Sequence, residues 1–74
     1  MELNEKRLRT IGHAIATERN RQGLSQETLA AMVGLTSHSH LSRVECGQKP
    51  PSMDLIFSLA DALGVEVHYF FIDI

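Results

Sequence analysis

The stretch that decides the fold reads Gly23-Leu24-Ser25-Gln26-Glu27-Thr28-Leu29-Ala30, then Gly34-Leu35-Thr36-Ser37, then Leu41-Ser42-Arg43-Val44-Glu45. Its first part has a serine placed just before a run with apolar residues at helical spacing. Serine side chains cap helix N-termini well, because the hydroxyl accepts a hydrogen bond from a free backbone N–H. We therefore expect Ser25 to cap a helix from Gln26 to about Val33, with Leu29 and either Met32 or Val33 pointing inward.

The second part repeats this pattern after Gly34, which is expected to end the first of the two helices. Ser37 is the preferred cap of the next helix, because that start places Leu41 and Val44 three residues apart on the buried side. Thr36 is the competing cap. The pattern thus predicts a helix-turn-helix whose second helix carries an outward row of small polar residues.

The flanking sequence predicts three further helical segments. A first helix is expected from about Asn4, a possible cap, to Gln22, with Leu8, Ile11 and Ile15 on one face. After a breaker at residues 47–51 that contains two prolines, a helix is expected from 53 to 63 and a short fifth helix with an apolar tail within 65–74. The expected architecture is an all-α, compact five-helix bundle in a single domain, residues 1–74.

Charge is divided unevenly along the chain. All seven basic residues lie within residues 1–50 beside five acidic ones, whereas residues 51–74 carry four acids and no base. This division indicates one end for an anionic partner and another for self-association. A polar N-terminus, the absence of a long apolar run and the single Cys46 predict a cytoplasmic protein without a membrane span or an internal disulfide.

Over roughly residues 8–71 the chain resembles the lambda-repressor-like family of phage repressors, Cro proteins and related bacterial regulators. The matching pieces are Arg19 four residues before Gly-Leu-Ser-Gln, then Leu29-Ala30, Gly34-Leu35-Thr36, Leu41-Ser42-Arg43-Val44-Glu45 with Gly47, and Pro51-Ser52 leading to Leu63-Gly64-Val65. The sequence departs from the family by one extra residue between Gly34 and Leu41. If the turn absorbs this residue, Ser37 is the cap; if the helix start absorbs it, His40 becomes a candidate reader of DNA.

The resemblance implies roles for individual side chains. The residues implied to contact base edges are His38, Ser39, Ser42 and Arg43, and those implied to contact phosphates are Gln26, Ser37 and Lys49. Arg19 and Glu45 match a structural ion pair of the family that joins the first helix to the end of the third. Removing one member of such a pair would leave the other without its partner.

Histidines near the expected reading helix raise a metal hypothesis, which the spacing disfavours. Residues two apart on a helix, such as His38 and His40, lie about 200° apart and cannot bind one ion from a common face. No metal or other cofactor is therefore expected, and pH-dependent DNA affinity through these imidazoles is the more credible consequence.

The C-terminal residues are strongly apolar for so small a domain. The family resemblance implies a two-fold interface there, for which the candidate residues are Val67, Phe70, Phe71, Ile72 and Ile74. In the alternative interpretation, one phenylalanine fills the core and the last residues are frayed.

The sequence thus favours a sequence-specific transcriptional regulator, a repressor that binds a palindromic operator in double-stranded DNA as a homodimer. The alternative is a protein-interaction module with a protein partner, such as an antitoxin-like partner or a restriction-modification controller protein. An enzyme is the least favoured class, because the only thiol has no recognisable base partner and the chain has no glycine-rich phosphate loop.

Overall fold

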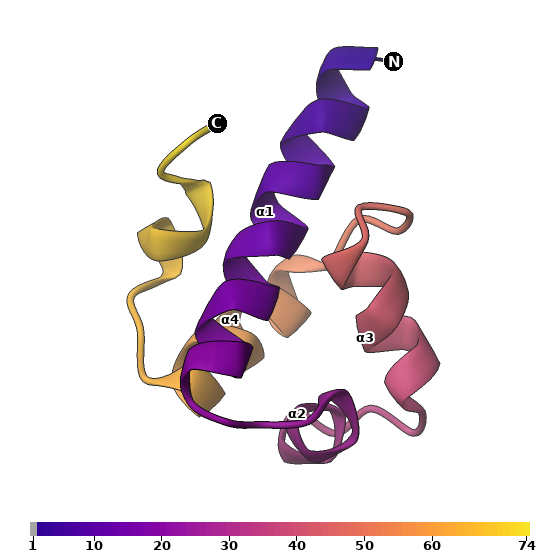
Figure 1. Ribbon diagram of the computed structural model, residues 1–74, viewed down its shortest axis with the longest axis vertical. Coiled ribbons are helices and arrows are strands. Elements are labelled where there is room, and N and C mark those ends of the chain that lie inside the picture. Colours follow the sequence, from indigo (N-terminus) through magenta and orange to yellow (C-terminus); the bar gives the residue numbers. More distant parts are fainter. Residues whose placement is uncertain (1) are drawn as a thin grey trace.

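The computed structural model describes residues 2–74, which form four α-helices and one 3-10 helix. These are α1 (Glu2–Arg21), α2 (Gln26–Met32), α3 (His38–Glu45), α4 (Met53–Leu63) and the 3-10 helix η1 (Val67–Phe71). Figure 1 shows α1 as the long central helix, with α3 along one side, η1 along the other, and α2 and α4 toward its C-terminal end. The all-α class is confirmed.

Two expectations about the ends of the chain are wrong. Asn4 does not cap α1, which already begins at Glu2; no glycine or proline stands before Asn4 to stop the helix from extending. The expected short fifth helix is present only as a 3-10 helix of five residues, so the bundle has four α-helices and not five. A segment this short makes few of the backbone bonds that stabilise an α-helix, so its tighter form is set by packing against the core.

The core is a single apolar cluster to which every element contributes. Its buried members are Ile11 and Ile15 of α1, Leu29 and Ala30 of α2, Leu41 and Val44 of α3, Leu55, Ile56, Leu59, Ala60 and Leu63 of α4, and Phe70 of η1. Of the two candidates at the end of α2, the C-cap residue Val33 packs against the core and Met32 is about half exposed. Leu8, expected to point inward, is only half-buried.

All four α-helices end in the same hydrogen-bonded motif built on a glycine. After α2, for example, Gly34 N–H donates to Ala31 O at 3.2 Å and Leu35 N–H donates to Ala30 O at 2.9 Å. Gly34 has a φ of +79°, a conformation that a side chain disfavours. The residue after the glycine packs on the core in three of the four cases, as Leu24, Leu35 and Val65, whereas after α3 it is the exposed Gln48. These motifs fix the short connections that hold α3 beside α2.

Helices α1 and α3 approach so closely that their backbones meet at Gly12. A methyl group built on this buried glycine would lie 2.3 Å from Val44 O and 2.5 Å from Glu45 O. The position of the C-terminal end of α3 is therefore set by direct backbone contact with α1, a constraint that the sequence did not reveal.

Candidate nucleic-acid interface

The start of α3 is fixed by its serine cap. Ser37 has an extended backbone, with φ −150° and ψ 141°, and its side chain accepts a hydrogen bond from Ser39 N at 3.0 Å. The helix begins at His38, so Ser37 rather than Thr36 is the cap, as preferred from the sequence. The register in which the turn contains the extra residue is the one observed.

This register separates two faces of α3. Leu41 and Val44 are fully buried, whereas His38, Ser39 and Arg43 are exposed. Ser42 and His40 are half-buried between these two faces. Because 3.6 residues make one turn, His38, Ser39 and Arg43 can all project from the outer side of the helix. An α-helix of this kind fits the width of the DNA major groove.

The three candidate phosphate ligands flank α3 from neighbouring segments. A shallow hollow between the first turns of α2 and α3 is lined by Arg19, Ser25, Gln26, Glu27 and His38. Ser37 is exposed at the start of α3, and Lys49 is exposed in the loop that follows it. A serine hydroxyl that caps a helix through an oxygen lone pair keeps its own O–H for a further bond. The fold therefore brings donor groups to both ends of the exposed face of α3.

Arg19 and Glu45 form the expected ion pair, which is confirmed. Arg19 Nε donates to Glu45 Oε2 at 2.7 Å and Arg19 Nη2 donates to Glu45 Oε1 at 3.0 Å, a bidentate geometry. The two side chains are 11% and 5% exposed. Arg19 Nη1 also donates to Leu24 O at 2.8 Å. The pair therefore joins α1 to the end of α3 and to the loop that leads into α2.

One contact in this network was not anticipated from the sequence. Gln26 Nε2 donates to Glu45 Oε1 at 2.8 Å, so the first residue of α2 is tied to the last residue of α3. Glu45 therefore accepts hydrogen bonds from side chains of two other helices. Glutamine at this position could be read from the sequence, but the 19-residue separation from Glu45 gave no signal for the contact.

A family model described as helix-turn-helix, HTH_3, matches residues 15–70. The chain belongs to this family. The family is of the Cro/cI, XRE type, and its members are DNA-binding transcriptional regulators and not enzymes. The protein is therefore a helix-turn-helix transcriptional regulator.

Individual members of the family are similar over most of the chain. An uncharacterized HTH-type transcriptional regulator of Sinorhizobium fredii, y4dJ, is 38% identical over 56 residues, which is 76% of this chain and 71% of that protein. The restriction-modification controller protein C.AhdI from Aeromonas hydrophila superimposes with a TM-score of 0.82 at 41% identity, covering 86% of this chain and 96% of that one. The clp gene regulator ClgR from Corynebacterium glutamicum superimposes with a TM-score of 0.82 at 33% identity, covering 88% of this chain and 69% of that one.

The C-terminal segment of this helix-turn-helix protein divides into buried and exposed apolar residues. Phe70 is 1% exposed and fills the core, so its assignment to a dimer interface is wrong. A side chain so deeply enclosed within one chain has no surface left for a partner. Ile72 and Ile74 are 65% and 48% exposed, and Val67 and Phe71 are half-buried. Part of the alternative interpretation, that one phenylalanine fills the core, is confirmed.

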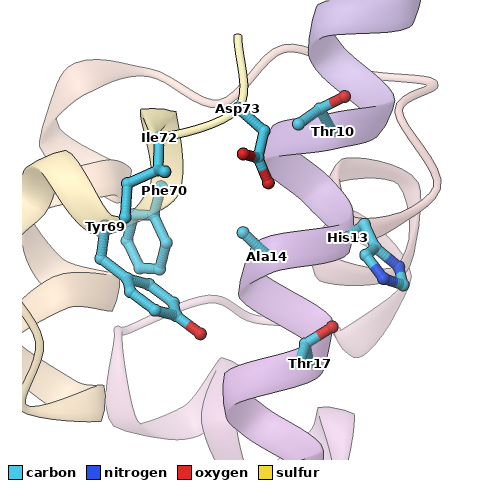
Figure 2. Close-up of a pocket in the computed structure, with 8 residues that line it drawn as sticks. All are labelled: Thr10, His13, Ala14, Thr17, Tyr69, Phe70, Ile72 and Asp73. Atoms are coloured by element: carbon cyan, nitrogen blue, oxygen red, sulfur yellow. The ribbon is translucent and has the colours of Figure 1, made fainter.

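A pocket lies between α1 and this segment of the regulator. Figure 2 shows Thr10, Ala14 and Thr17 along α1, with Tyr69 and Ile72 opposite and Asp73 directed toward the helix. His13 and Phe70 complete the lining. The pocket is thus formed by the same segment that exposes Ile72.

A buried acidic residue lies in the last turn of α1, next to the pocket-lining Thr17. Glu18 is 3% exposed, and its carboxylate accepts hydrogen bonds from Arg21 and from Gln22 Nε2. Gln22 Nε2 also donates to Leu63 O at 2.6 Å and so ties α1 to the end of α4. The Arg21 bond above all, and then the Gln22 bond, lower the pKa of Glu18 to about 2. The carboxylate is therefore charged at neutral pH.

Among residues 2–74 no group of three or more His, Cys, Asp or Glu side chains is arranged to hold a metal ion. Over the same residues, no helix combines the length and apolar character needed to cross a membrane.

Proposed function

We propose that this regulator binds a specific DNA sequence by inserting α3 into the major groove. The observation that carries the proposal is the exposed row His38, Ser39 and Arg43, held outward by the burial of Leu41 and Val44. A guanidinium can donate two parallel bonds to the O6 and N7 acceptors of guanine, so Arg43 is the candidate reader of one base pair. His38, Ser39 and the half-buried Ser42 complete the set of base contacts.

Backbone contacts would set the position of α3 on the duplex. Gln26 and Ser37 are candidate donors to phosphates at one end of the exposed face, and Lys49 is the candidate at the other. Glu27 is exposed beside Gln26 and lines the same hollow. Its negative charge lowers the affinity for any duplex, so binding depends on the correct base contacts more than on charge.

A two-fold dimer is the proposed binding form. Ile72 and Ile74 expose apolar surface and are flanked by Val67 and Phe71. Covering this surface with a second copy would bury it and would present two α3 helices about 34 Å apart, one turn of DNA. The operator is then a palindrome with half-sites about 10 base pairs apart. Occupation of such a site near a promoter represses transcription by excluding the polymerase.

The test begins with a selection from random duplexes. The proposal expects one palindrome to be enriched and bound with a steep salt dependence. Arg43→Ala should abolish the preference at one base pair per half-site, whereas Lys49→Ala should weaken all duplexes alike and flatten the salt slope by about one unit. A selection that enriches no sequence would refute sequence-specific binding. Equal losses on matched and scrambled DNA would remove Arg43 from the readers.

A second candidate is control of a restriction-modification system. It is favoured by the 41% identity and 0.82 TM-score to the restriction-modification controller C.AhdI. Locating the selected palindrome in the source genome tests it. A copy upstream of a restriction or methyltransferase gene adjacent to the gene of this protein supports the candidate, and copies only at unrelated promoters overturn it.

A further inference from the structure

Glu45 is the meeting point of three helices. Its carboxylate accepts bonds from Arg19 Nε at 2.7 Å, from Arg19 Nη2 at 3.0 Å and from Gln26 Nε2 at 2.8 Å, and its side chain is 5% exposed. An almost fully buried carboxylate needs such partners. Arg19 neutralises its charge, so the third bond is available to orient a neutral group rather than to compensate a charge.

That neutral group is the side-chain amide of Gln26. The amide nitrogen carries two hydrogens, and the structure of residues 2–74 gives it a single bond, the one to Glu45. Because the amide is planar, fixing one N–H fixes the direction of the other. Gln26 is half-buried and lines the hollow between the first turns of α2 and α3, together with His38.

We propose that Glu45 is a positioning residue for DNA binding, which holds the Gln26 amide so that its second N–H donates to a backbone phosphate. Glu45 itself does not touch the DNA. The inference rests on the proposed function, because it assigns Gln26 to a phosphate. The proposed role explains why the acidic Glu45 lies so close to the proposed DNA-binding surface. Arg19 neutralises the charge of Glu45, and the Glu45 carboxylate orients the Gln26 amide.

The sign of a charge effect separates this proposal from simple electrostatics. Removing a negative charge near DNA by itself raises affinity. Glu45→Ala removes a negative charge and leaves the positive charge of Arg19 without its partner, so electrostatics alone predicts tighter binding to DNA. The positioning role predicts weaker binding, because the freed Gln26 side chain must be ordered again when it meets the phosphate.

Glu27→Gln is the matched control. Glu27 lies next to Gln26 and is exposed, so its removal takes away a negative charge at nearly the same place without freeing the Gln26 amide. We expect this variant to bind the selected duplex more tightly. The pair of variants thus gives opposite changes in affinity for the same change in charge.

The experiment is a double-mutant cycle on the selected duplex at fixed salt, with each variant first shown to be folded by circular dichroism. Gln26→Ala and Glu45→Ala should each weaken binding by about tenfold, a typical loss for a bond to a charged acceptor. The double variant should lose no more than Gln26→Ala alone, because the positioning effect of Glu45 acts only through Gln26 and the loss of its charge can only raise the affinity. Independent, multiplying losses, or tighter binding by Glu45→Ala, would overturn the proposal.

A second measurement serves if Glu45→Ala does not fold. In the wild-type protein, NMR resolves the two side-chain hydrogens of Gln26, and one should already be hydrogen-bonded in the free state. Addition of the selected duplex should shift the other. No shift of the second hydrogen on a duplex that the protein binds overturns the positioning role, whereas failure to bind any duplex refutes the proposed function itself.

Discussion

Replacing Gly12 by alanine tests the backbone contact that sets the position of α3. The added methyl carbon would lie 2.3 Å from Val44 O and 2.5 Å from Glu45 O, more than 1 Å inside ordinary van der Waals distance. Both neighbours are backbone atoms of α3, so no side chain can rotate away. The helices must therefore separate by about 1 Å along their contact.

The change in the free energy of unfolding of Gly12→Ala is the sum of a steric cost and a gain in helix propensity. Forcing an extra methyl group into a packed interior costs about 1–3 kcal/mol, and contact with rigid backbone places this site at the upper end. Alanine favours the helix over glycine by about 1 kcal/mol. We expect a net destabilisation of about 2 kcal/mol, out of a total of about 4–11 kcal/mol for a domain of this size. The midpoint of thermal unfolding should fall by about 8–16 °C.

Thermal unfolding followed by circular dichroism measures this change. Gly23→Ala is the matched control, because it adds the same methyl group where no atom lies within 4 Å and costs only the backbone strain of a φ of +74°. That strain is about 1 kcal/mol. NMR shifts along α3 should change in Gly12→Ala and not in Gly23→Ala. An unfolding midpoint that stays constant or rises in Gly12→Ala would refute the close contact.

Three other predictions concern separate parts of the fold. Because the pKa of Glu18 is lowered in the folded protein, Glu18 takes up a proton in the unfolded chain at a higher pH than in the folded one. The stability that this carboxylate contributes is therefore fully present above pH 4.5 and is lost as the pH falls toward about 2. In urea titrations over this pH range, the free energy of unfolding of Glu18→Gln should change less with pH than that of the wild type, and an equal change would contradict the prediction. Ser37→Ala removes the cap bond to Ser39 N and should cost about 1 kcal/mol in the same assay, and no loss would contradict the observed cap. Ile72→Asp should convert the proposed dimer to a monomer in sedimentation experiments without unfolding the protein, and an unchanged assembly would exclude Ile72 from the proposed interface. Phe70→Ala, in contrast, should lower the free energy of unfolding by about 3–5 kcal/mol, because Phe70 lies in the core.

Local signals in the sequence predicted most helix boundaries. Ser25, Ser37 and Ser52 each cap the helix that follows, and glycine ends all four α-helices. The spacing of Leu41 and Val44 favoured Ser37 over Thr36 as the cap of α3 without excluding Thr36, and the structure confirms Ser37. These features depend on a few neighbouring residues, and local chemistry determines them.

Features that depend on distant parts of the chain were not predictable in this way. Glu18 and Arg21 form an i,i+3 pair of a kind that is usually solvated, yet Glu18 is buried, and nothing in the local spacing indicated this burial. The Gly12 contact and the Gln26 bond to Glu45 join segments that no periodicity relates. In the tail, five residues of 3-10 helix are too few for a pattern to show that Phe70 is buried and Ile72 is not.

The division of α3 into two faces has a consequence for how such regulators diversify. The exposed side chains of His38, Ser39 and Arg43 make no side-chain hydrogen bond within residues 2–74. The cap bond uses only the backbone N–H of Ser39, and the buried pair and the ion pair use other positions. Under the proposed function, substitutions at these three sites should therefore change the preferred operator while leaving the folding equilibrium almost unchanged. A chimera that carries the outward residues of another regulator should recognise new DNA at its original melting temperature.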